Sequence, residues 1–210
     1  MNQGYKVPLK DGKSEFTEKK SRFISYLAYV ETEDEAKEFI NSIRSKHRDA
    51  THNCIAYRLY DPRVERFSDD GEPAGTAGMP MLEVLKKEDI YNVCVVVTRY
   101  FGGVLLGGGG LIRAYGKGVS DVLTEVGSAV RLASVTLSLT FDYSGYSKIQ
   151  KLLETTVHCN ADSVFLQNVM LTVTLRQTDA EEFCKKVRDL LCGDVEINII
   201  SQNFDSFKKI

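Results

Sequence analysis

Glycine is concentrated in one part of this chain. Eleven of the 16 glycines lie between Gly71 and Gly118, and four of them are consecutive, from Gly107 to Gly110. Glycine adopts positive φ angles freely and allows close approach to the backbone, which suits tight loops and anion sites. The middle of the chain must therefore contain loops of unusual geometry, and any hypothesis about the protein's function must explain them.

The remaining composition is that of an ordinary globular protein. Of the 210 residues, 43% are hydrophobic and 27% are charged, and this length suits one large domain or two small ones. The formal net charge is -2, and the charges nearly balance on each side of residue 130. No part of the chain therefore exerts a bulk electrostatic attraction on nucleic acid.

The cysteines and the apolar segments indicate a cytoplasmic protein. The five cysteines are odd in number and show no CxxC spacing, which favours reduced thiols in the cytosol. The segment Met1–Lys13 lacks the apolar core of a signal peptide, and no apolar run approaches the roughly 18 residues of a membrane helix. We expect no membrane partner, no resident metal and no cofactor.

Residues 131–210 follow a clean order of strand, helix, strand, strand, helix, strand. Apolar alternation predicts strands at 135–141, 164–166, 169–175 and 195–199. Helical spacing predicts one helix behind an N-cap at Ser144 and another behind a capping box formed by Thr178 and Glu181. The order is the βαββαβ pattern of a ferredoxin-like domain.

Residues 1–130 are predicted to form a separate α+β domain, joined to the next without a Pro/Ser-rich linker. Residues 14–30 have the composition of strands, and Thr32 and Glu35 have the spacing of a capping box ahead of a helix. Further strands are predicted at 52–60, 64–67 and 93–97, the last buried on both faces, and further helices at 79–87 and 111–126.

An acidic segment at 68–78 is the first candidate site. Asp69, Asp70 and Glu72 repel one another unless a cation, a basic side chain or a helix N-terminus offsets their charge. They could bind a basic partner group or a hydrated magnesium ion. The alternative is a solvated turn, followed by a helix that Thr76 or a nearby group caps.

A glycine-rich segment at 98–115 is the second candidate site. A buried strand ends in Arg99, the glycines follow, and a helix begins near Gly110 with Arg113 in its first turn. Free backbone N–H groups, a positive helix end and two arginines would suit a phosphate. The segment matches neither a Walker A loop nor the Rossmann fingerprint.

A structural explanation of the same segment stays open. The glycines could serve only positive φ and close packing, with Arg99 and Arg113 paired to the acidic residues. Gly116 and Gly118 lie inside the predicted helix, where each costs about 1 kcal/mol relative to alanine. They therefore predict a close neighbour on that face of the helix.

His52 and Cys54 lie on one face of the predicted strand at 52–60. Side chains in this arrangement point in parallel, and no third zinc-like ligand follows, so a catalytic or metal-binding pair is weakly supported. A histidine satisfied within the core beside a buried thiol is the favoured interpretation.

Three long strings of residues lie between residues 50 and 115. They are HNCIAYR at 52–58, SDDGEP with GTAG at 68–78, and VTRYFGG through GGLIRAY at 97–115. These strings resemble the YigZ/IMPACT family, whose bacterial members share the domain order of nearly the whole chain. The resemblance implies an amino-terminal left-handed βαβ domain like one in a ribosomal small-subunit protein, a rare exception to right-handed crossovers. It also implies a carboxy-terminal ferredoxin-like domain similar to domain V of elongation factor G.

The resemblance also implies a role in translation. Eukaryotic members of the family regulate translation during amino-acid starvation through an RWD domain that this sequence lacks, whereas bacterial members have no settled activity. The family motifs correspond to His52, Asp69, Asp70, Glu72, Arg99 and Arg113. With the neighbouring loop residues, the candidate binding set is His52, Asp69, Asp70, Glu72, Thr76, Arg99, Gly102, Gly103, Gly109, Gly110 and Arg113.

Three hypotheses of function follow, and whether the protein is an enzyme stays undecided, with non-enzymatic binding favoured. The first is a binding protein linked to translation, whose surface holds an RNA phosphate or a ribosome-associated partner. The second is a hydrolase or transferase acting on a phosphorylated small molecule, which needs the carboxylates and both arginines in one pocket. The third places both arginines in inward salt bridges, with the partner surface on the second domain.

Overall fold

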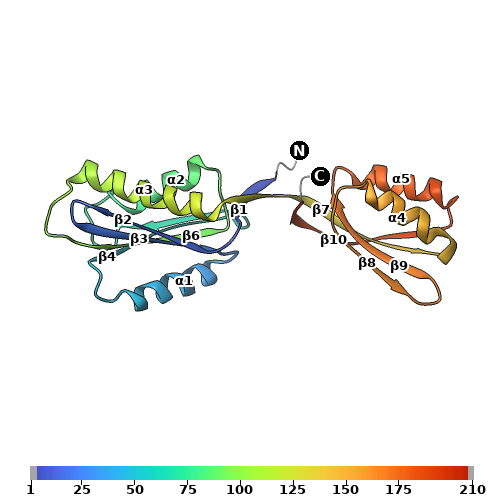
Figure 1. Cartoon of the computed structure of the whole chain (residues 1–210), viewed down its shortest axis with the longest axis horizontal. Helices are drawn as coiled ribbons and strands as arrows, with labels where there is room; N and C mark the ends of the chain where they lie inside the picture. The colour runs from blue at the N-terminus through green and yellow to red at the C-terminus, as the bar shows by residue number, and fades with distance from the viewer. Residues whose placement is uncertain (1–3, 208–210) are drawn as a thin grey trace. The chain divides into compact units, whose positions relative to one another are not determined.

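The computed structural model describes residues 4–207, which fold as two compact units. One unit comprises Tyr5–Ala129 and the other begins at Val130. Both are mixtures of helices and strands (Figure 1). This agrees with the predicted α+β class. None of the helices within the described residues is both long and apolar enough to cross a membrane.

The first unit is built on a five-stranded antiparallel sheet with the strand order β2-β3-β6-β4-β5. Its strands are β2 (Gly12–Glu18), β3 (Ser21–Tyr29), β4 (His52–Leu59), β5 (Val64–Ser68) and β6 (Val93–Tyr100). Because β3 and β4 are both antiparallel to β6, they run in the same direction, and helix α1 (Glu33–Lys46) connects them. The result is a βαβ unit with a third strand inserted between its two strands. A short strand, β1 (Tyr5–Pro8), lies outside this sheet, and its Lys6 also forms an isolated bridge with Ile90.

Helices cover both faces of this sheet (Figure 1). Helix α1 packs on one face, and α2 (Gly78–Lys87) and α3 (Gly108–Val126) pack on the other. Strand β6 faces both layers, since Val93, Val95 and Val97 join the α2/α3 core while Cys94 and Val96 join the α1 core. The absence of apolar alternation in this strand is thus explained by burial on both sides.

The second unit has the predicted βαββαβ order. Its elements are β7 (Ser128–Phe141), α4 (Tyr146–Glu154), β8 (His158–Phe165), β9 (Val169–Arg176), α5 (Ala180–Leu190) and β10 (Glu196–Ser206). The strands are antiparallel in the order β10-β7-β9-β8, and the two helices share one face of the sheet (Figure 1). One cluster of alternating strand residues and helix residues such as Ile149 and Phe183 forms its core.

Several local expectations need correction. Residues 14–30, which have the composition of strands, are divided between β2 and β3, because Lys19 and Lys20 adopt positive φ angles of 45° and 66° and turn the chain back. Helix α4 follows a 3-10 turn at Tyr143–Gly145, and its N-cap is Gly145 rather than Ser144. Helix α5 has Asp179 at its N-cap without a side-chain hydrogen bond, so the expected box does not form there.

The N-cap of α1 agrees with expectation, although Glu35 returns to the residue before the cap. The backbone N–H of Glu35 donates to Thr32 Oγ1 at 3.1 Å, and the Glu35 carboxylate accepts from the N–H of Glu31 at 2.6 Å. All five cysteines are free thiols.

Candidate functional site

The acidic loop between β5 and α2 does not gather its three carboxylates in one place. Asp69 turns toward the start of α2, where Oδ1 accepts from the N–H groups of Ala77 at 3.0 Å and Gly78 at 2.8 Å. Its Oδ2 accepts from the N–H of Gly75 at 2.8 Å. Asp69 therefore caps α2, where Thr76 or a nearby group was expected to do so.

Asp70 points in another direction. Its Oδ2 accepts from the backbone N–H of Asn53 at 2.7 Å, and its Oδ1 lies 3.2 Å from Arg44 Nη2 of α1. Thr76 does not cap α2 either, because its hydroxyl donates to the carbonyl of Pro73 at 2.6 Å. Asp70 thus attaches the acidic loop to β4, and Thr76 makes a hydrogen bond within the loop. Within the described residues, no three His, Cys, Asp or Glu side chains are placed to hold a metal ion together.

Glu72 and Arg99 form a buried ion pair at the end of β6. Arg99 Nη1 donates to Glu72 Oε1 at 2.7 Å, and the hydroxyl of Tyr115 on α3 donates to the same oxygen at 2.7 Å. Arg99 is only 5% exposed, and its Nη2 reaches Ser21 Oγ at 3.3 Å. Burial raises the pKa of Tyr115, so its hydroxyl stays a donor. Arg99 Nε is buried and makes no hydrogen bond.

His52 completes this cluster from the neighbouring strand. It is the register partner of Arg99 between β4 and β6, and both side chains lie on the sheet face that carries α2 and α3. Its Nδ1 is 2.8 Å from the carbonyl oxygen of Asp70, and its Nε2 is 3.7 Å from Glu72 Oε2. Since a carbonyl only accepts hydrogen bonds, Nδ1 carries a proton.

Cys54 does not share a site with His52. Its Sγ donates to the carbonyl of Asp69 at 2.9 Å, and burial raises the pKa of the thiol to about 12. A thiol with this pKa is protonated at neutral pH and is a poor nucleophile. The thiol therefore fastens the acidic loop to the sheet.

The glycine-rich loop leads into an uncapped helix. The backbone of Gly102 lies against that of Lys20 so closely that a Cβ would stand 2.0 Å from the Lys20 carbonyl oxygen, and Gly103 has φ of 78°. Helix α3 then begins with no side chain capping it. The N–H of Leu111 donates to the carbonyl of Gly107 at 2.9 Å, so the N–H groups of residues 108–110 precede the first helical hydrogen bond.

Arg113 lies over this first turn. It is exposed, it has no ion pair within the described part of the chain, and its Nη1 is 3.6 Å from where a Cβ on Gly109 would stand. Arginine side chains on helices point back toward the N-terminus, which explains this placement. Arg113 borders a hollow of about 240 Å³, together with Gly110, Lys19 and Lys117.

A separate cleft of about 370 Å³ lies beside the α3 N-terminus. His52, Glu72 and Arg99 line it from the sheet and the acidic loop, and Gly107 and Gly108 line it from α3. Its walls are apolar, with contributions from Pro73, Phe101, Leu105, Leu106 and Leu111. The structure thus brings together part of the candidate set. Arg113, Asp69 and Asp70 do not line this cleft.

Some residues of this site were not candidates from the sequence. Tyr115 and Phe101 lay within the family strings, but neither they nor Leu105 belonged to the candidate binding set; Phe101 and Leu105 are 44% and 81% exposed. Exposed apolar side chains beside glycines are a signal that could have drawn attention to this loop.

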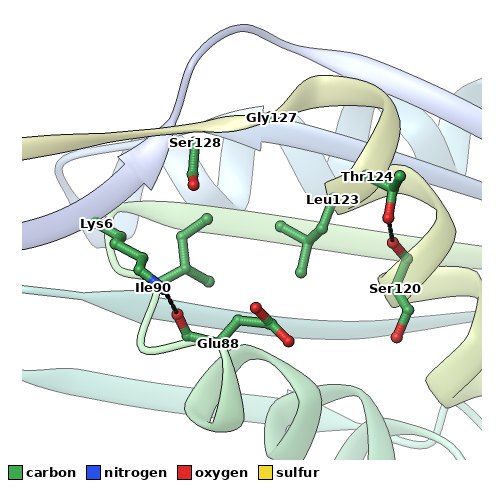
Figure 2. Close-up of a pocket in the computed structure, with 8 residues that line it drawn as sticks. All are labelled: Lys6, Glu88, Ile90, Ser120, Leu123, Thr124, Gly127 and Ser128. Atoms are coloured by element: carbon green, nitrogen blue, oxygen red, sulfur yellow. Dashed lines mark hydrogen bonds between the residues drawn. The ribbon is translucent and has the colours of Figure 1, made fainter.

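A third hollow, of about 250 Å³, lies between α3 and the strand residue Lys6 (Figure 2). Two of its polar side chains are engaged in local bonds, since Lys6 Nζ donates to the carbonyl of Glu88 at 3.1 Å and Thr124 Oγ1 donates to that of Ser120 at 2.9 Å. None of the candidate residues lines it.

Comparison with known proteins matches both units. Residues 19–123 match the Impact N-terminal domain, and residues 139–193 match a domain of unknown function, DUF1949. The IMPACT family member YvyE of Bacillus subtilis (strain 168) is 40% identical over 198 residues, which cover 94% of this chain and 91% of that protein. The IMPACT family member YigZ of Escherichia coli (strain K12) is 37% identical over 187 residues, covering 88% and 92%. A crystal structure of a hypothetical protein is 35% identical with a TM-score of 0.62, covering 96% of this chain and 99% of that one.

Proposed function

The chain belongs to the IMPACT family, and from this premise we propose that it is a non-enzymatic regulatory protein linked to translation. The role in translation that the family resemblance implies supports the proposal. We further propose that the protein binds single-stranded RNA through a phosphate held at the N-terminus of α3. The observation that carries this proposal is the uncapped first turn of α3 with Arg113 over it, an arginine without an ion pair among residues 4–207.

The chemistry of this turn suits a phosphate. Three backbone N–H groups at residues 108–110 point out of the helix, and the helix dipole places positive charge at the same end. Arg113 adds a guanidinium that can bind phosphate oxygens in pairs, and Lys19 lines the same hollow. One local site of this kind gives modest affinity for RNA in a protein of net charge -2.

The arrangement of charges favours binding over the alternative of a hydrolase or transferase. That alternative requires both arginines and the carboxylates within hydrogen-bonding reach of one substrate. Asp69 and Asp70 are occupied by backbone N–H groups, and Arg113 borders a different hollow from Arg99.

The test is a titration of fluorescent single-stranded RNA over a series of salt concentrations, combined with ribosome co-sedimentation. We expect binding at low salt that weakens as salt rises, and a salt slope reduced by about 1 in Arg113→Ala. No association with RNA or ribosomes at low salt would overturn the proposal. Association with ribosomes but not with RNA would point instead to a protein partner.

A negative charge introduced at the first turn separates binding from folding. Gly109→Asp places a carboxylate among the free N–H groups and four residues before Arg113, so it should abolish RNA binding while stabilising the helix end. Gly116→Ala is the matched control, since it also replaces a glycine of α3 but lies away from the turn. It should bind RNA as the unchanged protein does.

A further inference from the structure

The cleft beside the α3 N-terminus contains two hydrogen-bond acceptors that face each other. His52 Nδ1 donates to the carbonyl of Asp70, so in the neutral ring Nε2 bears a lone pair. Glu72 Oε1 already receives Arg99 and Tyr115, which leaves Oε2 for another donor. The two free acceptors are 3.7 Å apart. They cannot bond to each other in this tautomer, but a ligand with two adjacent hydroxyl groups would satisfy both.

The N-terminus of α3 also lines the cleft, through Gly107 and Gly108, and its backbone N–H groups suit an anion. A second observation is independent of the helix. The Glu72 side chain is only 3% exposed, and it lines the cleft with Oε2 left for a ligand, while its Oε1 neutralises the neighbouring Arg99 at 2.7 Å.

The size and walls of the cleft limit the ligand to one small unit. Its volume of about 370 Å³ is at the lower end of the range of roughly 300–1,000 Å³ for small-molecule pockets. Phe101 and Leu105 offer an exposed ring and an aliphatic surface beside the polar groups. A flat aromatic base can stack against such a wall.

From these features we infer that the cleft selects a ribonucleotide. The phosphate lies at the first turn of α3, and the 2′- and 3′-hydroxyls of the ribose donate to His52 Nε2 and Glu72 Oε2. A carboxylate that accepts from ribose hydroxyls is also how dinucleotide-binding folds recognise ribose. This inference rests on the proposed function and narrows it, because free 2′- and 3′-hydroxyls occur together only in a free nucleotide or at the 3′ end of an RNA.

The test is isothermal titration of the full chain with the four ribonucleoside 5′-monophosphates and their 2′-deoxy counterparts. A missing 2′-hydroxyl leaves one acceptor unpaired, so deoxynucleotides should bind about tenfold more weakly. Among oligoribonucleotides, those ending in a 3′-phosphate should bind more weakly than those ending in a 3′-hydroxyl. Equal binding of ribo and deoxy forms would overturn the inference.

Two substitutions at His52 provide matched variants. His52→Asn can keep an N–H directed at the Asp70 carbonyl but removes the acceptor at the Nε2 position. This variant should therefore bind ribonucleotides as weakly as the unchanged protein binds deoxyribonucleotides. His52→Gln extends an amide toward the Nε2 position and should recover part of the selectivity for ribose. Thermal unfolding of both variants checks that the fold is intact, and full selectivity in a folded His52→Asn would contradict the inference.

The outcomes separate this inference from the proposed function. Suppose that Gly109→Asp abolishes RNA binding but that ribonucleotides and deoxyribonucleotides bind equally well. This result would support the proposed function and overturn the inference that the cleft selects a ribonucleotide. Selective binding of ribonucleotides without any binding of RNA keeps the cleft and overturns the proposed function.

Discussion

The carboxylate of Glu72 and the guanidinium of Arg99 meet at 2.7 Å with only 3% and 6% of their side chains exposed. They come from the acidic loop and from the end of β6, so this one contact joins two motifs that are separate in the sequence. The position of Arg99 inside the sheet is thereby fixed. The same pair also forms part of the cleft wall.

Removing one partner of this pair should destabilise the fold strongly. Glu72→Ala leaves the Arg99 charge buried without a counter-ion, and we expect the free energy of unfolding to fall by about 3–5 kcal/mol. Urea denaturation monitored by circular dichroism measures this free energy. Glu15→Ala, which removes the exposed partner of Arg22, is the control and should leave the midpoint nearly unchanged. A Glu72→Ala midpoint equal to that of the control would show that the pair is not important for stability.

Asp69 should matter more than an ordinary helix cap. It accepts hydrogen bonds from three backbone N–H groups, whereas the Thr32 hydroxyl of α1 accepts from one. We expect Thr32→Ala to cost about 1 kcal/mol and Asp69→Ala to exceed that figure. Chemical denaturation of both variants under the same conditions gives the comparison, and the prediction fails when Asp69→Ala is the milder change.

Gly118 and Gly116 should respond in opposite ways to alanine. A Cβ on Gly118 would stand 2.6 Å from Ser25 Oγ, a buried hydroxyl without a hydrogen bond, while one on Gly116 would be 3.7 Å from Val84. Gly116→Ala should raise the free energy of unfolding by up to about 1 kcal/mol through helix propensity. Gly118→Ala should lower it by about 1–3 kcal/mol through overpacking.

A double substitution tests the cause in Gly118→Ala. Ser25→Ala removes the hydroxyl that the new methyl group would meet. Combined with Gly118→Ala, it should therefore restore most of the lost stability, which thermal unfolding measures. If the double variant were as unstable as the sum of the two single changes, the clash would have to lie elsewhere.

His47 should make the stability depend on pH. Burial lowers its pKa below the ordinary value of 6.5, and its ring nitrogens lie 2.8 Å from the hydroxyls of Tyr26 and Tyr100. The unfolded chain therefore binds the proton more readily than the folded one. Stability contributed by this group is present above pH 6.5 and is lost as the pH falls from there toward the lower pKa of the folded state.

The measurement is the free energy of unfolding between pH 7.5 and 5.5. We expect His47→Gln to be less stable at neutral pH, because the hydrogen bonds to the two tyrosines change. Its free energy of unfolding should also vary less with pH than that of the unchanged protein. Identical slopes would assign the pH dependence to other groups.

The two central strands of the second unit, β7 and β9, were predictable because each has one face in the core. Strand β8 has no buried residue, and it begins at His158 rather than at the predicted residue 164. Val135, Leu137 and Leu139 alternate with exposed or half-buried Ser and Thr residues, so period and burial agree. Helix caps were harder to predict. Local spacing pointed to Thr178 and Ser144, yet neither side chain caps its helix. A capping pattern requires the chain before the helix to adopt a particular path, and spacing does not specify that path.

The acidic loop shows a different limit of sequence reasoning. The grouping of Asp69, Asp70 and Glu72 indicated a shared site, but Asp70 adopts a φ of 46° and the three side chains diverge. Each then meets a partner from a distant part of the chain: the start of α2, the backbone of β4, and Arg99. Pairing of Arg99 with an acidic residue was one of the open alternatives, and the path of the acidic loop after β5 brings Glu72 to it.

Strand β6 occupies the middle of its sheet, although every other strand of that sheet precedes it in the chain. Strands β3 and β4 both pair with it. While the chain is being synthesised, these two strands have left the ribosome before residues 93–100 exist to join them. Each then presents an open edge, which is a template for pairing with other chains. The protein should therefore be most prone to aggregate during its own translation, and a nascent chain that stalls before residue 93 should need a chaperone.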